Sequence, residues 1–138
     1  MPKILGVDYG EAKIGLALSD ERGKIAFPYK TIATGKNPYE AIDKAIQGYH
    51  VDKIVVGLPL HMNGKESPLS LKVREFAATL QKKLQIPVTL FDERLTSAFS
   101  EKEMLEMEMN RKKRSEKSDV TAAVIILQNY LDSCIARD

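Results

Sequence analysis

Carboxylate side chains fall where apolar segments of this chain end, and Asp8 is the first of them. It closes the apolar run 3–8 and is followed by Tyr9 and Gly10. A buried carboxylate is costly unless it is neutralised, paired with a cation or bound to a metal. No Lys or Arg lies between Lys3 and Lys13 to pair with it locally. Asp8 is therefore a candidate metal ligand, with a simple turn-forming aspartate that caps Gly10 as the alternative.

A second pair of acids, Asp92 and Glu93, follows the apolar segment 86–91. Successive side chains of a strand point to opposite faces of its sheet, so only one of the two acids can easily join Asp8. The alternation of apolar and polar residues does not decide which one.

The third candidate acid is Asp119. Apolar or aromatic residues follow it at offsets of 3, 4, 7, 8 and 11, the spacing of one helix face: Ala122, Ala123, Ile126, Leu127 and Tyr130. Asp119 thus begins the stripe expected to pack on the sheet. The alternative is a first-turn aspartate that favours the helix dipole, with Ser118 as the cap.

Three inward carboxylates need a compensating cation. Oxygen ligands select Mg²⁺ or Mn²⁺ over zinc. Two such ions about 4 Å apart activate a water and stabilise the leaving oxygen of a phosphodiester. The pattern is weakly specific by itself, because the chain has 19 acidic residues and some will always seem to converge.

The basic residues are clustered although the net charge is only +2. Arg111, Lys112, Lys113 and Arg114 are consecutive, and Lys117 follows shortly before Asp119. Such a run is usually a solvated loop. Its position next to a candidate metal ligand favours a patch that binds the phosphates of a nucleic acid.

The elements that must position these residues follow from apolar patterning. Strands are predicted at 3–8, 12–18, 25–32, 52–59 and 86–91, and helices from 38, at 68–84, at 96–109 and from 118 to about 135. Pro28 marks the third strand as an edge or bulged strand. The first three strands can form an antiparallel meander, and helical crossovers make the last two parallel to the first. The predicted fold is α/β, a mixed five-stranded sheet with helices on both faces, and parallel strands in it place their site where their carboxyl ends meet.

Length and composition limit the alternatives. The 138 residues, 43% of them hydrophobic, predict one domain over residues 1–138. No apolar stretch approaches the roughly 20 residues of a membrane span, and nothing resembles a signal peptide. The single cysteine, Cys134, excludes an internal disulfide framework and fits a reducing compartment.

Four motifs, in order, resemble the YqgF/RuvX-type nucleases, a family with the RNase H-like fold. They cover the chain from its first strand to its last helix: 6–10 with 13–17, then 56–59, then 92–96, and finally Asp119 with 122–123 and 126–128. Lys13 stands where Arg is common in the family, which keeps the charge but loses the planar guanidinium.

The resemblance implies a catalytic triad of Asp8, Glu93 and Asp119 that binds Mg²⁺ or Mn²⁺, with two ions expected. It thus favours Glu93 over Asp92. It further implies a cytoplasmic hydrolase that processes the 5′ end of precursor 16S ribosomal RNA on ribosomal precursor particles. Resolution of four-way Holliday junctions in DNA is the alternative. The expected phosphate contacts are Lys13, Arg94, Arg111, Lys112 and Arg114.

Other classes remain open at this stage. The Asp8–Gly10 segment also resembles the first phosphate loop of actin-like ATP-binding proteins, but a second lobe does not fit in 138 residues. A ribosome-associated protein that binds nucleic acid without cleaving it is a further alternative. The sequence is compatible with a monomer or a homodimer, although symmetric cutting of a junction requires a twofold dimer.

Overall fold

The computed structural model describes residues 2–92 and 116–137. The strands are β1 (Lys3–Asp8), β2 (Lys13–Ser19), β3 (Ala26–Ala33), β4 (Val51–Leu58) and β5 (Val88–Asp92). The helices are α1 (Pro38–Ile46), α2 (Pro68–Leu84) and α4 (Glu116–Arg137). The helix predicted at 96–109 lies outside the described residues.

All five strands form one mixed sheet in the order β3-β2-β1-β4-β5. β1 pairs antiparallel with β2, and β2 with β3, whereas β1 and β4, and β4 and β5, are parallel. The predicted meander and parallel crossovers are confirmed. The carboxyl ends of β1, β4 and β5 therefore meet at one edge of the sheet, hereafter the carboxyl edge.

Pro28 lies where its ring is tolerated. β3 is an edge strand, and its pairing with β2 shifts register opposite Leu16 and Ala17, so that Tyr29 is the extra residue. Proline has no N–H to donate to a neighbouring strand, and an edge strand with a bulge does not need one. The prediction of an edge or bulged strand is confirmed.

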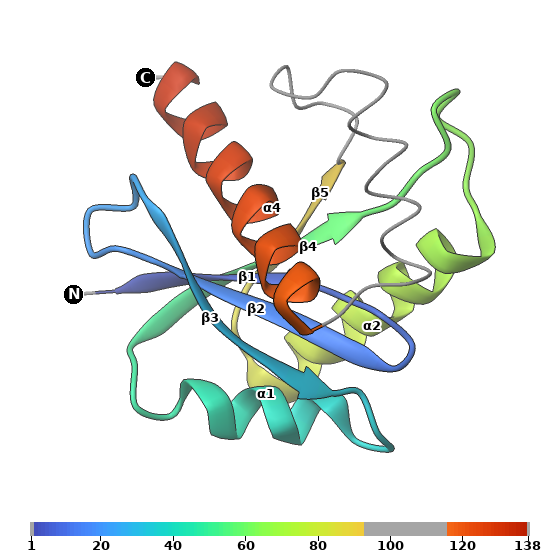
Figure 1. Ribbon diagram of the computed structural model, residues 1–138, viewed down its shortest axis with the longest axis horizontal. Coiled ribbons are helices and arrows are strands. Elements are labelled where there is room, and N and C mark those ends of the chain that lie inside the picture. Colours follow the sequence, from blue (N-terminus) through green and yellow to red (C-terminus); the bar gives the residue numbers. More distant parts are fainter. Residues whose placement is uncertain (1, 93–115, 138) are drawn as a thin grey trace.

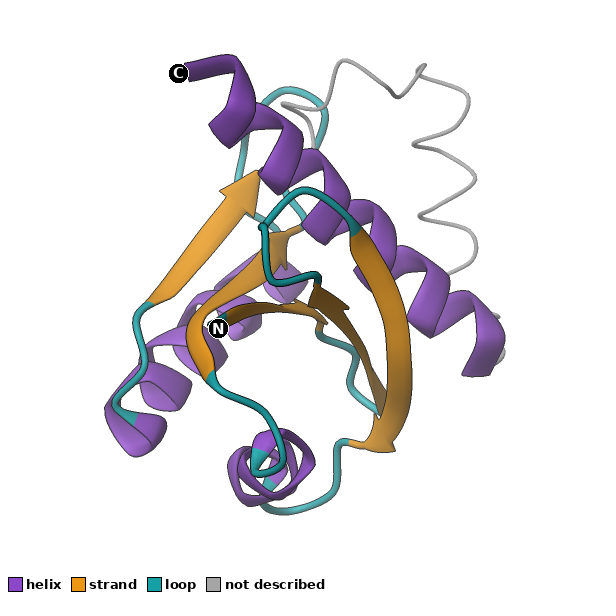
Figure 2. Ribbon diagram, turned by 90° about the vertical axis from the view of Figure 1, so that its left-hand side faces the viewer, coloured by secondary structure: helices purple, strands orange, loops and turns teal. Residues whose placement is uncertain are grey.

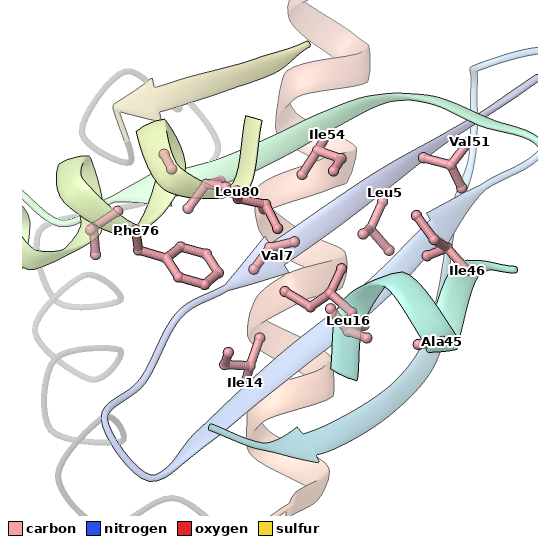
Figure 3. Close-up of a cluster of buried hydrophobic side chains, with 14 of the residues drawn as sticks. Leu5, Val7, Ile14, Leu16, Ala45, Ile46, Val51, Ile54, Phe76 and Leu80 are labelled. Carbon is pink, nitrogen blue, oxygen red and sulfur yellow. The ribbon is translucent and has the colours of Figure 1, made fainter. Parts of the chain in front are cut away.

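Helices cover both faces of the sheet (Figure 2). On one face, α1 and α2 bury the larger apolar cluster, called the first core. Its strand residues include Leu5 and Val7 of β1, Leu16 of β2, and Ile54 and Val56 of β4. Figure 3 labels all of these residues except Val56 and shows side chains of this core between the sheet and the two helices, with α4 behind the sheet.

The opposite face packs against α4, which crosses the sheet diagonally (Figure 1). This second core contains all of the predicted stripe except Ala122, and its buried members from the helix are Ala123, Ile126, Leu127, Tyr130 and Leu131. The amide of Gln128 also fastens the β2–β3 hairpin, because its oxygen accepts from the N–H of Ala26 and its nitrogen donates to the carbonyl of Lys24, both at 2.9 Å.

One helix boundary differs from the sequence prediction and another is newly defined. Helix α1, whose end the sequence did not predict, stops at Ile46, just before the helix-weakening Gly48, and Tyr49 packs edge-on against Tyr29. Helix α4 begins at Glu116, so Ser118 lies inside its first turn and the predicted cap at that residue is wrong. The start of α1 is as predicted, since the side chain of Asn37 accepts from the N–H of Glu40.

Candidate functional site

Asp8 is the last residue of β1 and is almost completely buried, with 1% of its surface exposed. Its neighbour Val7 belongs to the first core, beneath α1 and α2. Gly6 faces the other way, since a Cβ built on it would lie 2.7 Å from Cβ of Leu127 in α4. Strand alternation therefore places Asp8 on the face covered by α4. A carboxylate is thus buried at the carboxyl edge, as the sequence predicted.

Glycines flank Asp8 on both neighbouring strands. Gly15 stands opposite it in β2, and Gly57 follows Val56, the partner of Val7, in β4. Both glycines share the face of Asp8, because Ala17 and Val55, two residues from each, pack in the second core. Glycine contributes no side chain at either of these two positions. Such positions allow a ligand or another backbone to approach closely.

The end of β5 shows on which face of the sheet Asp92 lies, a question that the sequence left open for Asp92 and Glu93. Phe91 packs in the second core with α4, whereas Leu90 packs against the first core. Asp92, the next residue, therefore lies on the face of α1 and α2, opposite to that of Asp8. Asp92 is aligned with Leu58 of β4, so it does reach the carboxyl edge. Glu93 lies outside the described residues.

The course of α4 can be followed along β1. Near the start of β1, the amino group of Lys53, aligned with Ile4, donates to the hydroxyl of Tyr130 at 2.6 Å, and this bond is the main reason that the pKa of Lys53 is raised. Further along, Gly6 meets Leu127 and Ala123. The helix thus runs backwards along β1, and its amino-terminal end lies toward Asp8.

Asp119 precedes Ala123 by four residues, one helical turn. Its backbone position on α4 is therefore on the side of the carboxyl edge. The side chain of Asp119 is outside the described part of the chain, as are all atoms of Arg94, Arg111, Lys112 and Arg114. Among the predicted phosphate contacts only Lys13 is described, as an exposed residue at the start of β2.

Within residues 2–92 and the described side chains of α4, no three His, Cys, Asp or Glu residues come together as a metal site. Of the three predicted ligands, only Asp8 has a described side chain, so the triad stays a prediction. The donor chemistry suits a divalent ion, because a buried carboxylate offers the oxygen ligands that such ions prefer. Also within the described residues, no helix has the length and apolarity that crossing a membrane requires.

Two loops at the carboxyl edge are tied to α2 by ion pairs that the sequence did not reveal. Lys72 binds Glu11 of the β1–β2 turn at 2.6 Å, and this bond lowers the pKa of Glu11 and raises that of Lys72. Arg74 binds Glu66 of the β4–α2 loop at 2.5 Å. The hydroxyl of Ser70, followed by Arg74, lowers the pKa of Glu66. Glu11 and Glu66 are thus each held by a cation of α2.

Tyr9 anchors the backbone that follows Asp8. Its ring lies 4.6 Å from the ring of Phe76 in α2, measured between centroids. Burial, followed by the charge of Glu11, raises the pKa of Tyr9, so its phenol stays neutral at physiological pH. No spacing signal in the sequence joins Tyr9 to Phe76 or Glu11 to Lys72, because each pair depends on how α2 packs.

Two solved structures of similar fold are complexes with Holliday junctions. T. thermophilus RuvC in complex with a Holliday junction substrate aligns with a TM-score of 0.61 and 12% identity, over 98% of this chain and 96% of that one. The fowlpox virus resolvase with Holliday junction DNA aligns with a TM-score of 0.61 and 14% identity, over 96% and 99%. At these identities the likeness shows the fold alone, and it confirms the predicted RNase H-like class.

Sequence comparison gives the family. The model of the RuvX family, described as "Holliday junction resolvase", matches residues 2–133. A relative from Protochlamydia amoebophila is 43% identical over 140 residues, 95% of this chain and 93% of the relative. One from Clostridium tetani is 45% identical over 133 residues, 95% and 96%. Both relatives carry the name "Putative pre-16S rRNA nuclease".

The mixed sheet and its RuvC-like neighbours define an RNase H-like protein. The chain belongs to the RuvX family. The names within this family describe enzymes that cut nucleic acids, so the family is one of nucleases.

Proposed function

We propose that this protein is a divalent-metal-dependent endonuclease whose ions are held by Asp8, Glu93 and Asp119. The observation that carries the proposal is the burial of Asp8, 1% exposed, at the carboxyl edge between two glycine positions. A carboxylate with that burial is stabilised by positive charge, and oxygen ligands favour Mg²⁺ or Mn²⁺.

Strand alternation supports Glu93 as the second ligand. Phe91 faces α4 and Asp92 faces away from it, so the next residue of a continued strand returns to the face of Asp8. The family resemblance favours the same choice. Asp92 is then a neighbour of the site on the other side of the sheet.

The register of α4 supports Asp119 as the third ligand. The helix packs on β1 through Leu127 and Ala123, and Asp119 is one turn closer to the carboxyl edge. Its position on the helix continues the stripe that packs on the sheet, and this is the face of the sheet that carries Asp8.

The chemistry of this site is phosphodiester hydrolysis. Two bound ions would supply an activated water and stabilise the charge that develops on the leaving oxygen. Asp8, Glu93 and Asp119 would hold these ions. Lys13, Arg94, Arg111, Lys112 and Arg114 would hold the phosphates of the substrate, a role that positions the nucleic acid without reading its sequence.

The substrate we propose is structured RNA, the 5′ end of precursor 16S ribosomal RNA, cut in the cytoplasm on ribosomal precursor particles. It is supported by the names of relatives that are 43% and 45% identical over nearly their whole length. The second candidate is a four-way DNA junction, supported by the description of the family model. A junction cut symmetrically needs two matched sites and hence a homodimer, whereas trimming one RNA end can be done by a monomer.

The metal proposal is tested by Asp8→Asn. Asparagine keeps the size of the side chain but removes the charge, so we expect loss of Mg²⁺- and Mn²⁺-dependent cleavage with nucleic-acid binding largely intact. The matched control is Asp43→Asn, which makes the same change on the exposed side of α1 and should leave cleavage unchanged. An Asp8→Asn protein that cuts as fast as the parent would show that the metal assignment is wrong.

The choice of substrate is tested with the parent protein and Asp8→Asn side by side. Precursor 16S RNA and a four-way DNA junction are incubated at equal concentration with each metal, and the cut positions are mapped. We expect cleavage of the RNA near its mature 5′ end, abolished in Asp8→Asn. Paired symmetric cuts in the junction, with the RNA left intact, would instead establish a resolvase.

A further inference from the structure

Thr34 joins the end of β3 to the turn that follows Asp8. It is 7% exposed, and its hydroxyl donates to the carbonyl of Gly10 at 2.7 Å in a buried hydrogen bond. Its backbone N–H donates to the carbonyl of Ala12 at 3.0 Å. The residue that directly follows β3 thus holds two carbonyls of the β1–β2 turn, which is far away in sequence.

The opposite side of the same turn is held by α2. The ring of Tyr9 packs on Phe76, and the carboxylate of Glu11 binds Lys72. The Glu11–Lys72 pair is exposed, and exposed ion pairs contribute little. The buried hydrogen bond of Thr34 and the packing of Tyr9 on the buried Phe76 therefore fix the turn more firmly than the ion pair does.

The direction of this turn matters for Asp8. The pairing of β1 with β2 ends at Asp8 and Gly15, so the strand pairing holds the backbone up to Asp8 but not the backbone beyond it. The conformation of the turn therefore determines the path of the chain after Asp8. Gly10 is buried and carries no side chain, so only its backbone N–H and carbonyl can form hydrogen bonds. A hydrogen bond at that carbonyl constrains the backbone two residues from the candidate ligand.

We propose that Thr34 is a positioning residue for the metal site: its hydroxyl, through the Gly10 carbonyl, holds Asp8 in the orientation in which it binds divalent ions. The inference rests on the proposed function of Asp8 and adds a residue that does not touch the metal or the nucleic acid. Sites of this kind lose activity steeply when a group is displaced by about 1 Å.

The test compares Thr34→Val, which removes the hydroxyl at nearly constant shape, with Thr34→Ser, which retains it. Thr89→Val is the matched control, because it makes the same change in β5, the strand at the opposite edge of the sheet from β3. For each protein we would measure amide hydrogen exchange of peptides covering 8–13, Mn²⁺ binding by calorimetry without nucleic acid, and kcat and KM for cleavage. Should valine prevent folding, Thr34→Ala also removes the hydroxyl and takes its place.

We expect Thr34→Val to speed exchange in residues 9–13, to weaken Mn²⁺ binding about tenfold and to lower kcat with little change in KM, by analogy with displaced catalytic groups. Thr34→Ser should restore all three, and Thr89→Val should match the parent.

Parent-like exchange and Mn²⁺ affinity in Thr34→Val would overturn the role of Thr34, and so would a serine variant as defective as the valine variant. A parent protein that neither binds Mn²⁺ nor cleaves would overturn the metal site itself. The hydrogen-exchange comparison distinguishes these failures, because it reports on the turn whether or not metal binds.

Discussion

Gly6 of β1 and Leu127 of α4 touch so closely that no larger residue fits at position 6. A Cβ placed on Gly6 would lie 2.7 Å from Cβ of Leu127 and 3.2 Å from the carbonyl oxygen of Ala123. Both of these atoms belong to or adjoin the helix backbone, so rotation of a side chain cannot relieve the contact. The glycine thus sets how near α4 comes to the strand that carries Asp8.

Gly6→Ala should therefore push α4 away from the sheet. Forcing an extra methyl group into a packed interior costs about 1–3 kcal/mol, and we expect a loss of that size in the free energy of unfolding, measured with urea. Because α4 also carries Asp119, the proposed third ligand, Mn²⁺ binding should weaken in the same variant.

Gly48→Ala is the matched control, since a Cβ at Gly48 meets nothing within 4 Å. It should leave both the free energy of unfolding and Mn²⁺ binding close to those of the parent. If Gly6→Ala proved as stable as Gly48→Ala, α4 would not pack on β1 as closely as the structure shows.

The sheet could be predicted from sequence because the patterns that specify its strands lie in neighbouring residues. Unbroken apolar runs mark the buried strands 3–8 and 52–59, and the helices between the later strands impose parallel pairing on them. The stripe beginning at Asp119 likewise identifies the face of α4 that packs, since helical periodicity is a property of neighbouring residues.

The details of the site could not be predicted because they depend on tertiary packing. Whether Asp92 or Glu93 shares the face of Asp8 depends on the core in which Phe91 packs. The residues around Phe91 do not alternate strictly between apolar and polar, so they do not predict that core. The bond from Thr34 to Gly10 joins residues 24 apart, and the pair of Glu11 and Lys72 is 61 apart. No periodicity connects such positions.

Asp20 predicts a pH dependence of stability. Its carboxylate accepts from the N–H groups of Lys24 at 2.8 Å and Ile25 at 3.1 Å, which closes the β2–β3 hairpin. The hydrogen bond from Ile25, followed by that from Lys24, lowers the pKa of Asp20 in the folded protein. Its stabilising effect is therefore complete above the unfolded pKa, about 3.9, and is lost as pH falls through the folded value.

Asp20→Asn should accordingly unfold at lower urea concentration than the parent at pH 7, and the difference should shrink as the pH falls below about 3.9. Glu21→Gln, a neutralised acid on the same turn, is the control and should show no such convergence. A difference between Asp20→Asn and the parent that stays constant from pH 7 to pH 2 would exclude a contribution from the ionised carboxylate.

The basic run 111–114 predicts the salt dependence of binding. Each cation that meets a phosphate releases a counterion, so the logarithm of affinity falls with the logarithm of salt concentration by about 0.7 for each contact on a single strand. The variant with Arg111→Gln, Lys112→Gln, Lys113→Gln and Arg114→Gln should bind the precursor RNA more weakly and with a flatter slope.

The control variant removes four cations at the end of the sheet opposite the carboxyl edge: Lys24→Gln, Lys44→Gln, Lys82→Gln and Lys83→Gln. These lysines are exposed and lie near the ends of β2, α1 and α2 that point away from Asp8. Both variants lose the same net charge, so a general loss of attraction would affect them equally. A flattened slope confined to the 111–114 variant would place the path of the nucleic acid beside Asp119, whereas equal slopes in both variants would move that path elsewhere on the surface.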